Sequence, residues 1–224
     1  MTAKNDELSA TPETKRFARS GAELPKKFHD EIYFLALFIN EEFGKIPGAY
    51  VTPNLNNDNY DATVTFEDGS KIFIEVTQAK NGHDESLRLE VLSLEGVVSL
   101  TSPIVRVEGR KGTPARNVKI PLQHIAKDHR ETLDENFRLV ESTVTAKAKR
   151  HYGKNFILLV VVDDYLAFRE KPHHALLDQL ITSKLLSPNL DFGRLVIFGR
   201  SGKVLLSYKL PKYFSTGVDT ILYA

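Results

Sequence analysis

The chain has 224 residues, of which 42% are hydrophobic and 26% charged, a composition typical of a globular protein with a sizeable core. Its formal net charge is +1, so no overall field attracts it to nucleic acid or to an anionic membrane, and any basic patch must be local. The chain has no cysteine, which excludes disulfides, thiolate catalysis and cysteine-ligated zinc.

The N-terminal segment is polar, and we expect a flexible arm over residues 1–20 followed by a single domain over residues 21–224. The segment lacks the apolar stretch of a signal peptide. The longest apolar run, FILLVVV at residues 156–162, is too short to cross a bilayer. These features predict a cytoplasmic protein without a membrane partner.

Apolar residues recur at helical spacing over residues 23–44 and predict a first helix, with Gly44 at the position of a C-terminal cap. Residues 49–66 then alternate as a strand, a polar turn and a second strand. The dipeptide Asp68-Gly69 predicts a two-residue hairpin turn, and a strand over residues 71–79 follows it.

The second half of the chain alternates helices and strands. A short helix is expected over residues 84–96, with Asp84 as its N-cap. The later predictions are a β-ribbon or mobile loop over 98–120, a helix over 128–151, a strand over 155–164 that is covered on both faces, a helix over 173–186, and two strands around Ser201-Gly202. This order predicts an α/β fold with a mixed central β-sheet flanked by helices.

Two carboxylates stand among apolar strand residues. Glu75 lies within IFIEVT, where a desolvated charge is costly unless a cation compensates it. Taken singly, each acid has a structural interpretation, since Asp61 can bond turn backbone and Glu75 can pair with Lys71. A two-residue turn at Asp68-Gly69 would set Asp61 opposite position 76, so a bulge or a three-residue turn is needed to bring the acids together.

Two carboxylates held that close repel each other unless a divalent cation lies between them, and carboxylate oxygens are ligands that Mg²⁺ prefers. A pair of acids that point into solvent, or that each have their own lysine or arginine, would need no metal. The geometry of Asp61 and Glu75 therefore decides whether a metal site is plausible.

The order of a helix with Glu31, a strand with Asp61 and a hairpin return with Glu75 in IEVT resembles the PD-(D/E)XK nuclease superfamily, over about residues 25–165. The resemblance implies a restriction endonuclease-like core and hydrolysis of phosphodiester bonds in DNA. It also implies one or two Mg²⁺ (or Mn²⁺) ions held by Asp61, Glu75 and the carbonyl of Val76, with Glu31 as an outer ligand. Many members act as dimers, so a homodimer stays open.

The sequence departs from this family at one position. Two residues after the glutamate, where the family has a lysine that positions the attacking water, this chain has Thr77. Lys80, Lys71 and Lys147 are candidates for a displaced catalytic cation. Lys71 lies about 13 Å from Glu75 along the strand, and Lys147 lies on the predicted long helix near its Val140 and Val144 stripe. The departure also keeps an alternative open, namely a catalytically inactive nuclease fold that binds nucleic acid or a protein partner.

Basic residues gather in the segment that follows the hairpin. The predicted contacts to a DNA backbone are Arg88, Arg106, Arg110, Lys111, Arg116 and Lys119. The alternative is a solvated loop.

Other common site motifs are absent: the sequence has no P-loop, dinucleotide-binding, HExxH or GxSxG pattern. His173 and His174 are adjacent, which is not the spacing of a ligand pair, and we expect no zinc site from them.

Overall fold

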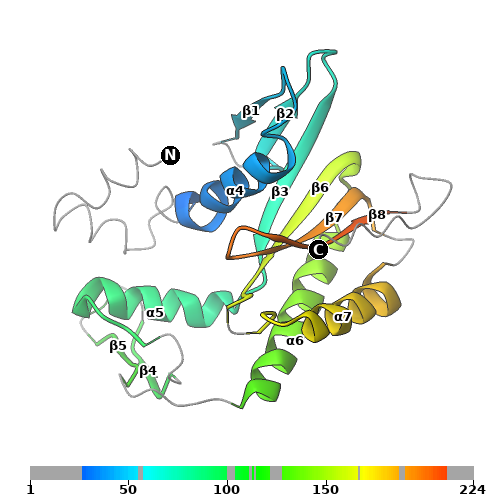
Figure 1. The fold of residues 1–224 in the computed structure, drawn as a ribbon. Coiled ribbons are helices and arrows are strands. Elements are labelled where there is room, and N and C mark those ends of the chain that lie inside the picture. The colour runs from blue at the N-terminus through cyan, green and yellow to red at the C-terminus, as the bar shows by residue number, and fades with distance from the viewer. Residues whose placement is uncertain are drawn as a thin grey trace. The chain divides into compact units, whose positions relative to one another are not determined.

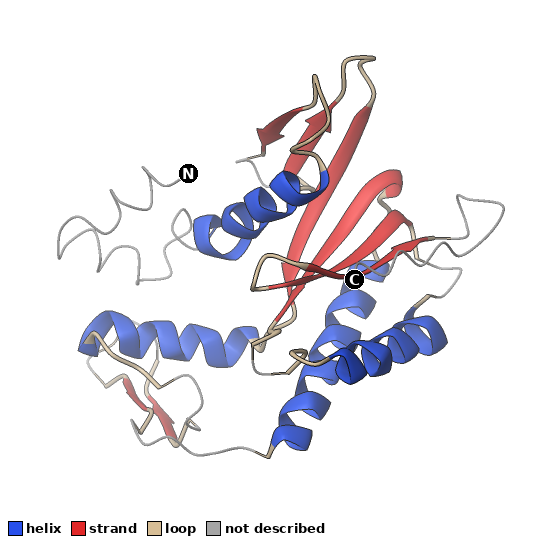
Figure 2. Ribbon diagram, in the orientation of Figure 1, coloured by secondary structure: helices blue, strands red, loops and turns tan. Residues whose placement is uncertain are grey.

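The computed structural model describes residues 27–54, 58–99, 104–110, 113, 115–121, 128–165, 167–186 and 190–210. The expected arm over residues 1–20 lies outside these ranges. The described part is a mixed α/β structure with four α-helices and a six-stranded sheet (Figures 1 and 2), which confirms the predicted fold class. The chain divides into two compact units, Asp30–Ala79 with His129–Ala224, and Met1–His29 with Lys80–Asp128.

The larger unit contains the central sheet, whose strand order is β1-β2-β3-β6-β7-β8. β1, β2 and β3 form an antiparallel meander, β3, β6 and β7 run parallel, and β8 returns antiparallel to β7. The strands are β1 (Tyr50–Pro53), β2 (Ala62–Thr65), β3 (Lys71–Gln78), β6 (Gly153–Val162), β7 (Phe192–Gly199) and β8 (Val204–Lys209).

Helices cover both faces of this sheet. The π-helical turn η1 (Phe28–Ile32) leads into α4 (Tyr33–Glu42), which packs Phe34, Leu35 and Phe38 on one face. On the other face lie α6 (His129–Ala148), α7 (Lys171–Leu180) and its π-helical extension η2 (Ile181–Leu185). We call these the α4 face and the α6 face. The strand β6 is buried over its last six residues, as its apolar run predicted.

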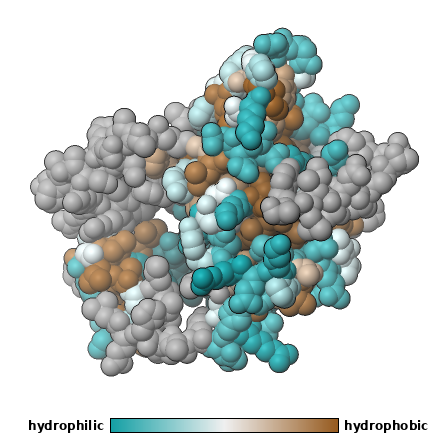
Figure 3. All heavy atoms as spheres, in the orientation of Figure 1, coloured by the Kyte–Doolittle hydropathy of each residue, from teal (hydrophilic) through white to brown (hydrophobic). Residues whose placement is uncertain are grey.

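The hairpin between β2 and β3 closes with three residues, not with the two that Asp68-Gly69 predicted. Phe66 still pairs with Ser70 (N–O 3.0 Å), so the loop is Glu67–Gly69. Gly69 has φ of 79°, the left-handed conformation that completes a three-residue turn. Asp68 accepts a hydrogen bond from the Ser70 amide (2.8 Å) and fixes this longer loop. The exposed, hydrophilic tip stands at the top of Figure 3. The pairing shifts by one residue, and Ala62 faces Ile74.

The smaller unit is built on α5 (Gly82–Glu95) and a two-stranded ribbon of β4 (Arg106–Glu108) and β5 (Asn117–Lys119). The predicted N-cap Asp84 is wrong. Asn81 caps the helix instead, because its side chain accepts the amides of His83 and Asp84, and the helix therefore begins two residues earlier than expected. Of the two forms expected for residues 98–120, a β-ribbon is the one present.

The described residues contain no helix with both the length and the apolar character needed to cross a membrane.

Candidate functional site

Asp61 lies immediately before β2 and is bonded to β3 on both sides of Glu75. Its amide donates to the carbonyl of Ile74 (2.8 Å), and its carboxylate Oδ2 accepts the amide of Val76 (2.7 Å). The three-residue turn makes this possible, because it moves the register by the one residue that separated Asp61 from Glu75. The structure therefore brings the two predicted acids next to each other.

Glu75 is the only buried acidic residue of the described strands, with 6% of its surface exposed, and it points to the α6 face. Its Oε1 is paired with Lys147 Nζ and lies 3.8 Å from a guanidinium nitrogen of Arg150. Lys147 lies in the last turn of α6 and Arg150 follows two residues after its end, and both approach the same oxygen.

Burial raises the pKa of Glu75, and the nearby charge of Asp61 adds to this rise, while Lys147 and Arg150 oppose it. Part of the burial is aromatic. Phe73, two residues earlier on the same face, stacks on Phe156 (centroids 4.9 Å apart), and Tyr152 packs against that ring. An apolar wall of this kind excludes water and strengthens each charge–charge interaction beside it.

The carbonyl of Val76 belongs to the same site. The backbone N–H and C=O groups of successive residues alternate in direction along a strand. The Ala79 amide bonds to Val161 of β6, so the backbone groups of odd-numbered residues in β3 point to β6. Those of even-numbered residues point to β2, as the bonds of Ile74 and Val76 to Asp61 show. The β2–β3 ladder ends at Ala62 and Ile74. The Val76 carbonyl therefore points past the end of β2, toward the side of Asp61.

Thr77 shares a face with Glu75 but has no charge, and the cation at this site comes from α6. The apolar stripe of α6 places Val140 and Val144 against the sheet, and Lys147 continues that stripe by one further turn. Helical spacing thus aims Lys147 at the sheet, where it meets Glu75. Lys71, at the exposed end of β3, is four residues away from Glu75.

Arg150 and Tyr152 join the site although the sequence analysis did not include them. Arg150 is half exposed, and Tyr152 is buried, with a pKa that is raised by burial and by the charge of Glu75. Both residues lie at least 75 positions along the chain from Glu75. The one sequence signal for them is that they follow within five residues of Lys147, just beyond α6.

Glu31 belongs to the turn that precedes α4. It lies in η1, and the neighbouring Asp30 accepts the side-chain amide of Gln78 through its carbonyl (2.9 Å) and its carboxylate (3.3 Å). Gln78 points to the α4 face, as strand alternation predicted, while Glu75 points to the α6 face. Because its turn leads into α4, Glu31 belongs to the α4 face.

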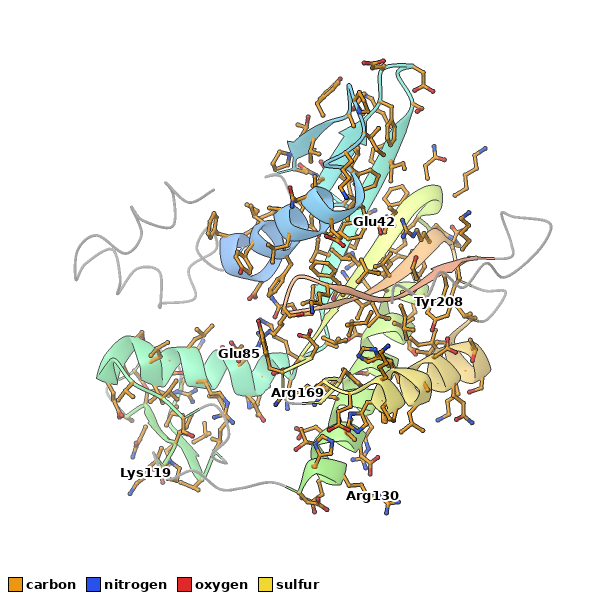
Figure 4. All side chains as sticks on the ribbon, in the orientation of Figure 1. Glu42, Glu85, Lys119, Arg130, Arg169 and Tyr208 are labelled. Carbon is orange, nitrogen blue, oxygen red and sulfur yellow. The ribbon has the colours of Figure 1, made fainter. Side chains whose placement is uncertain are left out.

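The predicted DNA-binding residues belong to the smaller unit, and some of them have internal partners. Arg116 makes a two-pronged ion pair with Glu90 (2.7 and 2.9 Å) and also donates to the carbonyl of Gly109. Arg88 donates to the carbonyl of Ser99. Arg110 and Lys119 are exposed on the ribbon, where Figure 4 labels Lys119. Lys111 lies outside the described residues, as does the side chain of Arg106.

The donor set is small. No group of three or more histidine, aspartate or glutamate side chains suited to a metal occurs among the described residues. Asp61, Glu75 and the Val76 carbonyl are two carboxylates and one carbonyl, and Mg²⁺ is commonly bound by one or two carboxylates with water and phosphate completing its shell. The chemistry of these donors therefore fits Mg²⁺ or Mn²⁺.

Comparisons with known proteins give no relative: no family model, no curated protein and no solved structure matches the chain.

Proposed function

We propose that this protein is a metal-dependent nuclease that hydrolyses phosphodiester bonds in DNA at Asp61, Glu75 and Lys147. The observation that carries the proposal is the meeting of Lys147 with Glu75 beside Asp61. The motif lysine missing at Thr77 is thereby supplied from α6. The element order also supports a restriction endonuclease-like core, since a helix, three antiparallel strands, a helix and a parallel strand follow one another in the larger unit.

The metal site would consist of the free oxygen of Asp61, the carboxylate of Glu75 and the carbonyl of Val76. A divalent ion there would polarise the scissile phosphate and lower the pKa of a bound water. The amide of Val76 holds one oxygen of Asp61 and so fixes the direction of the other. Lys147 opposes the rise that burial causes in the pKa of Glu75, and it adds a positive charge where the phosphate gathers negative charge.

A second candidate function rests on the same contacts. Glu75 already has a lysine and an arginine beside it, and Asp61 has a backbone donor, so neither acid requires a metal to be stable. An inactive nuclease fold that binds DNA or a protein would keep this arrangement for stability alone. The two functions differ in one measurable property, which is metal-dependent cleavage.

The test compares wild-type protein with the double variant Asp61→Asn/Glu75→Gln on supercoiled plasmid and on end-labelled linear duplex, with Mg²⁺, Mn²⁺ or EDTA. We expect cleavage only with metal and a loss of at least about 100-fold in the double variant, because both metal-binding charges are removed. The matched control is Glu67→Gln/Asp134→Asn, which removes two exposed charges, one from the hairpin tip and one from α6, and should cleave normally.

Equal cleavage by the wild type and the Asp61/Glu75 variant would contradict the proposal. Binding of DNA without cleavage at any metal concentration would favour the inactive fold.

A further inference from the structure

A pair of histidines joins the two helices of the α6 face. His129 is the first residue of α6 and His173 lies in the first turn of α7, and their Nε2 atoms are 3.3 Å apart. His129 is exposed and His173 is buried, with 9% of its surface accessible. Eighteen helical positions, about 27 Å of axis, separate His129 from Lys147. The pair is therefore independent of the carboxylate site.

The geometry of the two rings fits a shared ion. Two imidazole nitrogens bound to one tetrahedral Zn²⁺, each at about 2.0–2.1 Å, lie about 3.3–3.4 Å from each other, which is the separation found here. A single straight hydrogen bond of that length would set the ring centroids about 5.6 Å apart. They are 4.8 Å apart. Two imidazoles that share one tetrahedral ion would have centroids about 5.2 Å apart, so the observed separation is closer to that of a shared ion than to that of a linear hydrogen bond.

Of the two ring nitrogens of the buried His173, Nε2 faces His129 at 3.3 Å and is the one that an ion shared with His129 would occupy. Nδ1 is shielded from solvent and has no hydrogen-bond partner among the described residues. The neighbouring His174 differs from His173, since its Nε2 lies 2.7 Å from the carbonyl of Phe168 and is held by the backbone.

We propose that His129 and His173 bind a late first-row divalent cation, of the class Zn²⁺, Ni²⁺ or Cu²⁺, with water at the remaining positions. Imidazole is a preferred ligand of these ions, and Mg²⁺ prefers oxygen. A bound ion would link the N-terminal ends of α6 and α7. Because it binds the folded chain, it would also raise the stability of the larger unit.

The experiment titrates Zn²⁺ into tag-free, EDTA-stripped protein by calorimetry, with excess Mg²⁺ present to occupy carboxylate sites. We expect one equivalent of Zn²⁺ per chain and a Zn²⁺-dependent rise in Tm. His129→Ala changes an exposed position and should fold. Its affinity should fall more than about tenfold, since even the hydrogen-bond partners of ligating imidazoles contribute 10–100-fold. His173→Gln should behave in the same way.

Two controls separate this site from others. His83→Ala removes an exposed imidazole elsewhere and should bind Zn²⁺ normally. Asp61→Asn/Glu75→Gln should also retain the Zn²⁺ equivalent, whether or not the protein is a nuclease. Absence of Zn²⁺ binding by the wild type, or undiminished binding by His129→Ala, would overturn the proposal, as would loss of binding in the Asp61/Glu75 variant.

Discussion

Two buried ion pairs lie on opposite faces of the sheet, and they differ in how completely they are matched. On the α4 face, Arg194 of β7 holds both oxygens of Glu42, which Figure 4 labels, at 2.7 and 3.1 Å, and its Nε donates to Ser207. On the α6 face, Lys147 and Arg150 both meet a single oxygen of Glu75, beside a second acid. The first pair is two-pronged, while in the second two cations approach one carboxylate oxygen.

This difference distinguishes an ion pair that stabilises the fold from one that could take part in a reaction. In the two-pronged Glu42–Arg194 pair, the guanidinium donors bind fixed protein acceptors, and the pair therefore helps to specify how α4 packs on the sheet. In the Glu75–Lys147 pair, burial disfavours the charged form of the carboxylate, while the lysine ammonium favours it. We therefore assign the Glu42–Arg194 pair to stability and the Glu75–Lys147 pair to the proposed reaction. The predictions below test that assignment.

The largest expected effect is on cleavage by Lys147→Met. Loss of the cation should reduce the rate by about 100-fold, the usual effect of removing one group that stabilises developing charge. Adding Thr77→Lys to this variant puts a lysine at the family's position, on the same face as Glu75, and should restore part of the rate. Single-turnover cleavage assays would measure both. If Lys147→Met cleaves like wild type, Lys147 serves only the fold.

The next effect concerns stability on the α4 face. Arg194→Met leaves Glu42 nearly buried without its guanidinium, and we expect a loss of about 3 kcal/mol, the lower end for breaking a buried pair, because Arg194 keeps some exposure. Glu75→Gln removes a desolvated charge and should change stability by less than about 1 kcal/mol. Urea denaturation gives both values. Similar losses in the two variants would remove the distinction between the pairs.

The smallest effect is a pH dependence of stability that comes from Glu75 on the α6 face. The pKa of Glu75 is raised in the folded state, so the unfolded chain releases this proton first as pH rises. The contribution of Glu75 to stability therefore declines from its ordinary pKa up through the raised one, and Glu75→Gln lacks that decline. Denaturation in EDTA between about pH 4 and 8 should show the variant gaining on wild type. A difference that stays constant or shrinks with pH would contradict it.

Local patterns in the sequence predicted most of the fold. The helix periods, the apolar run of β6 and the alternation of β3 all reflect residues that are near one another in the chain. The orientation of Gln78 and Glu75 toward opposite faces follows from alternation alone. The register predicted from a two-residue turn was wrong by one residue. Asp68-Gly69 also suits a three-residue turn, because the Asp68 side chain accepts the Ser70 amide.

The candidate site was only partly predictable for a different reason. Lys147 could be named because the Val140 and Val144 stripe fixes the side of α6 that meets the sheet. Arg150 and Tyr152 lie beyond the end of α6, where helical periodicity no longer predicts the direction of a side chain. The His129–His173 pair joins residues 44 positions apart. Contacts of this kind depend on how helices cross, which one sequence does not specify.

The parallel pairing of β3 with β6 has a consequence for how the chain folds. Each pair in this ladder, from Phe73 with Phe156 to Gln78 with Val161, joins residues 83 positions apart. Closing so long an interval is slow, because the entropy of the loop is lost before the ladder forms. The helix α5 and the β4–β5 ribbon lie inside that interval, and structure that forms there before the ladder would shorten the effective loop. The segment between β3 and β6 in the sequence would then speed the pairing of these two strands.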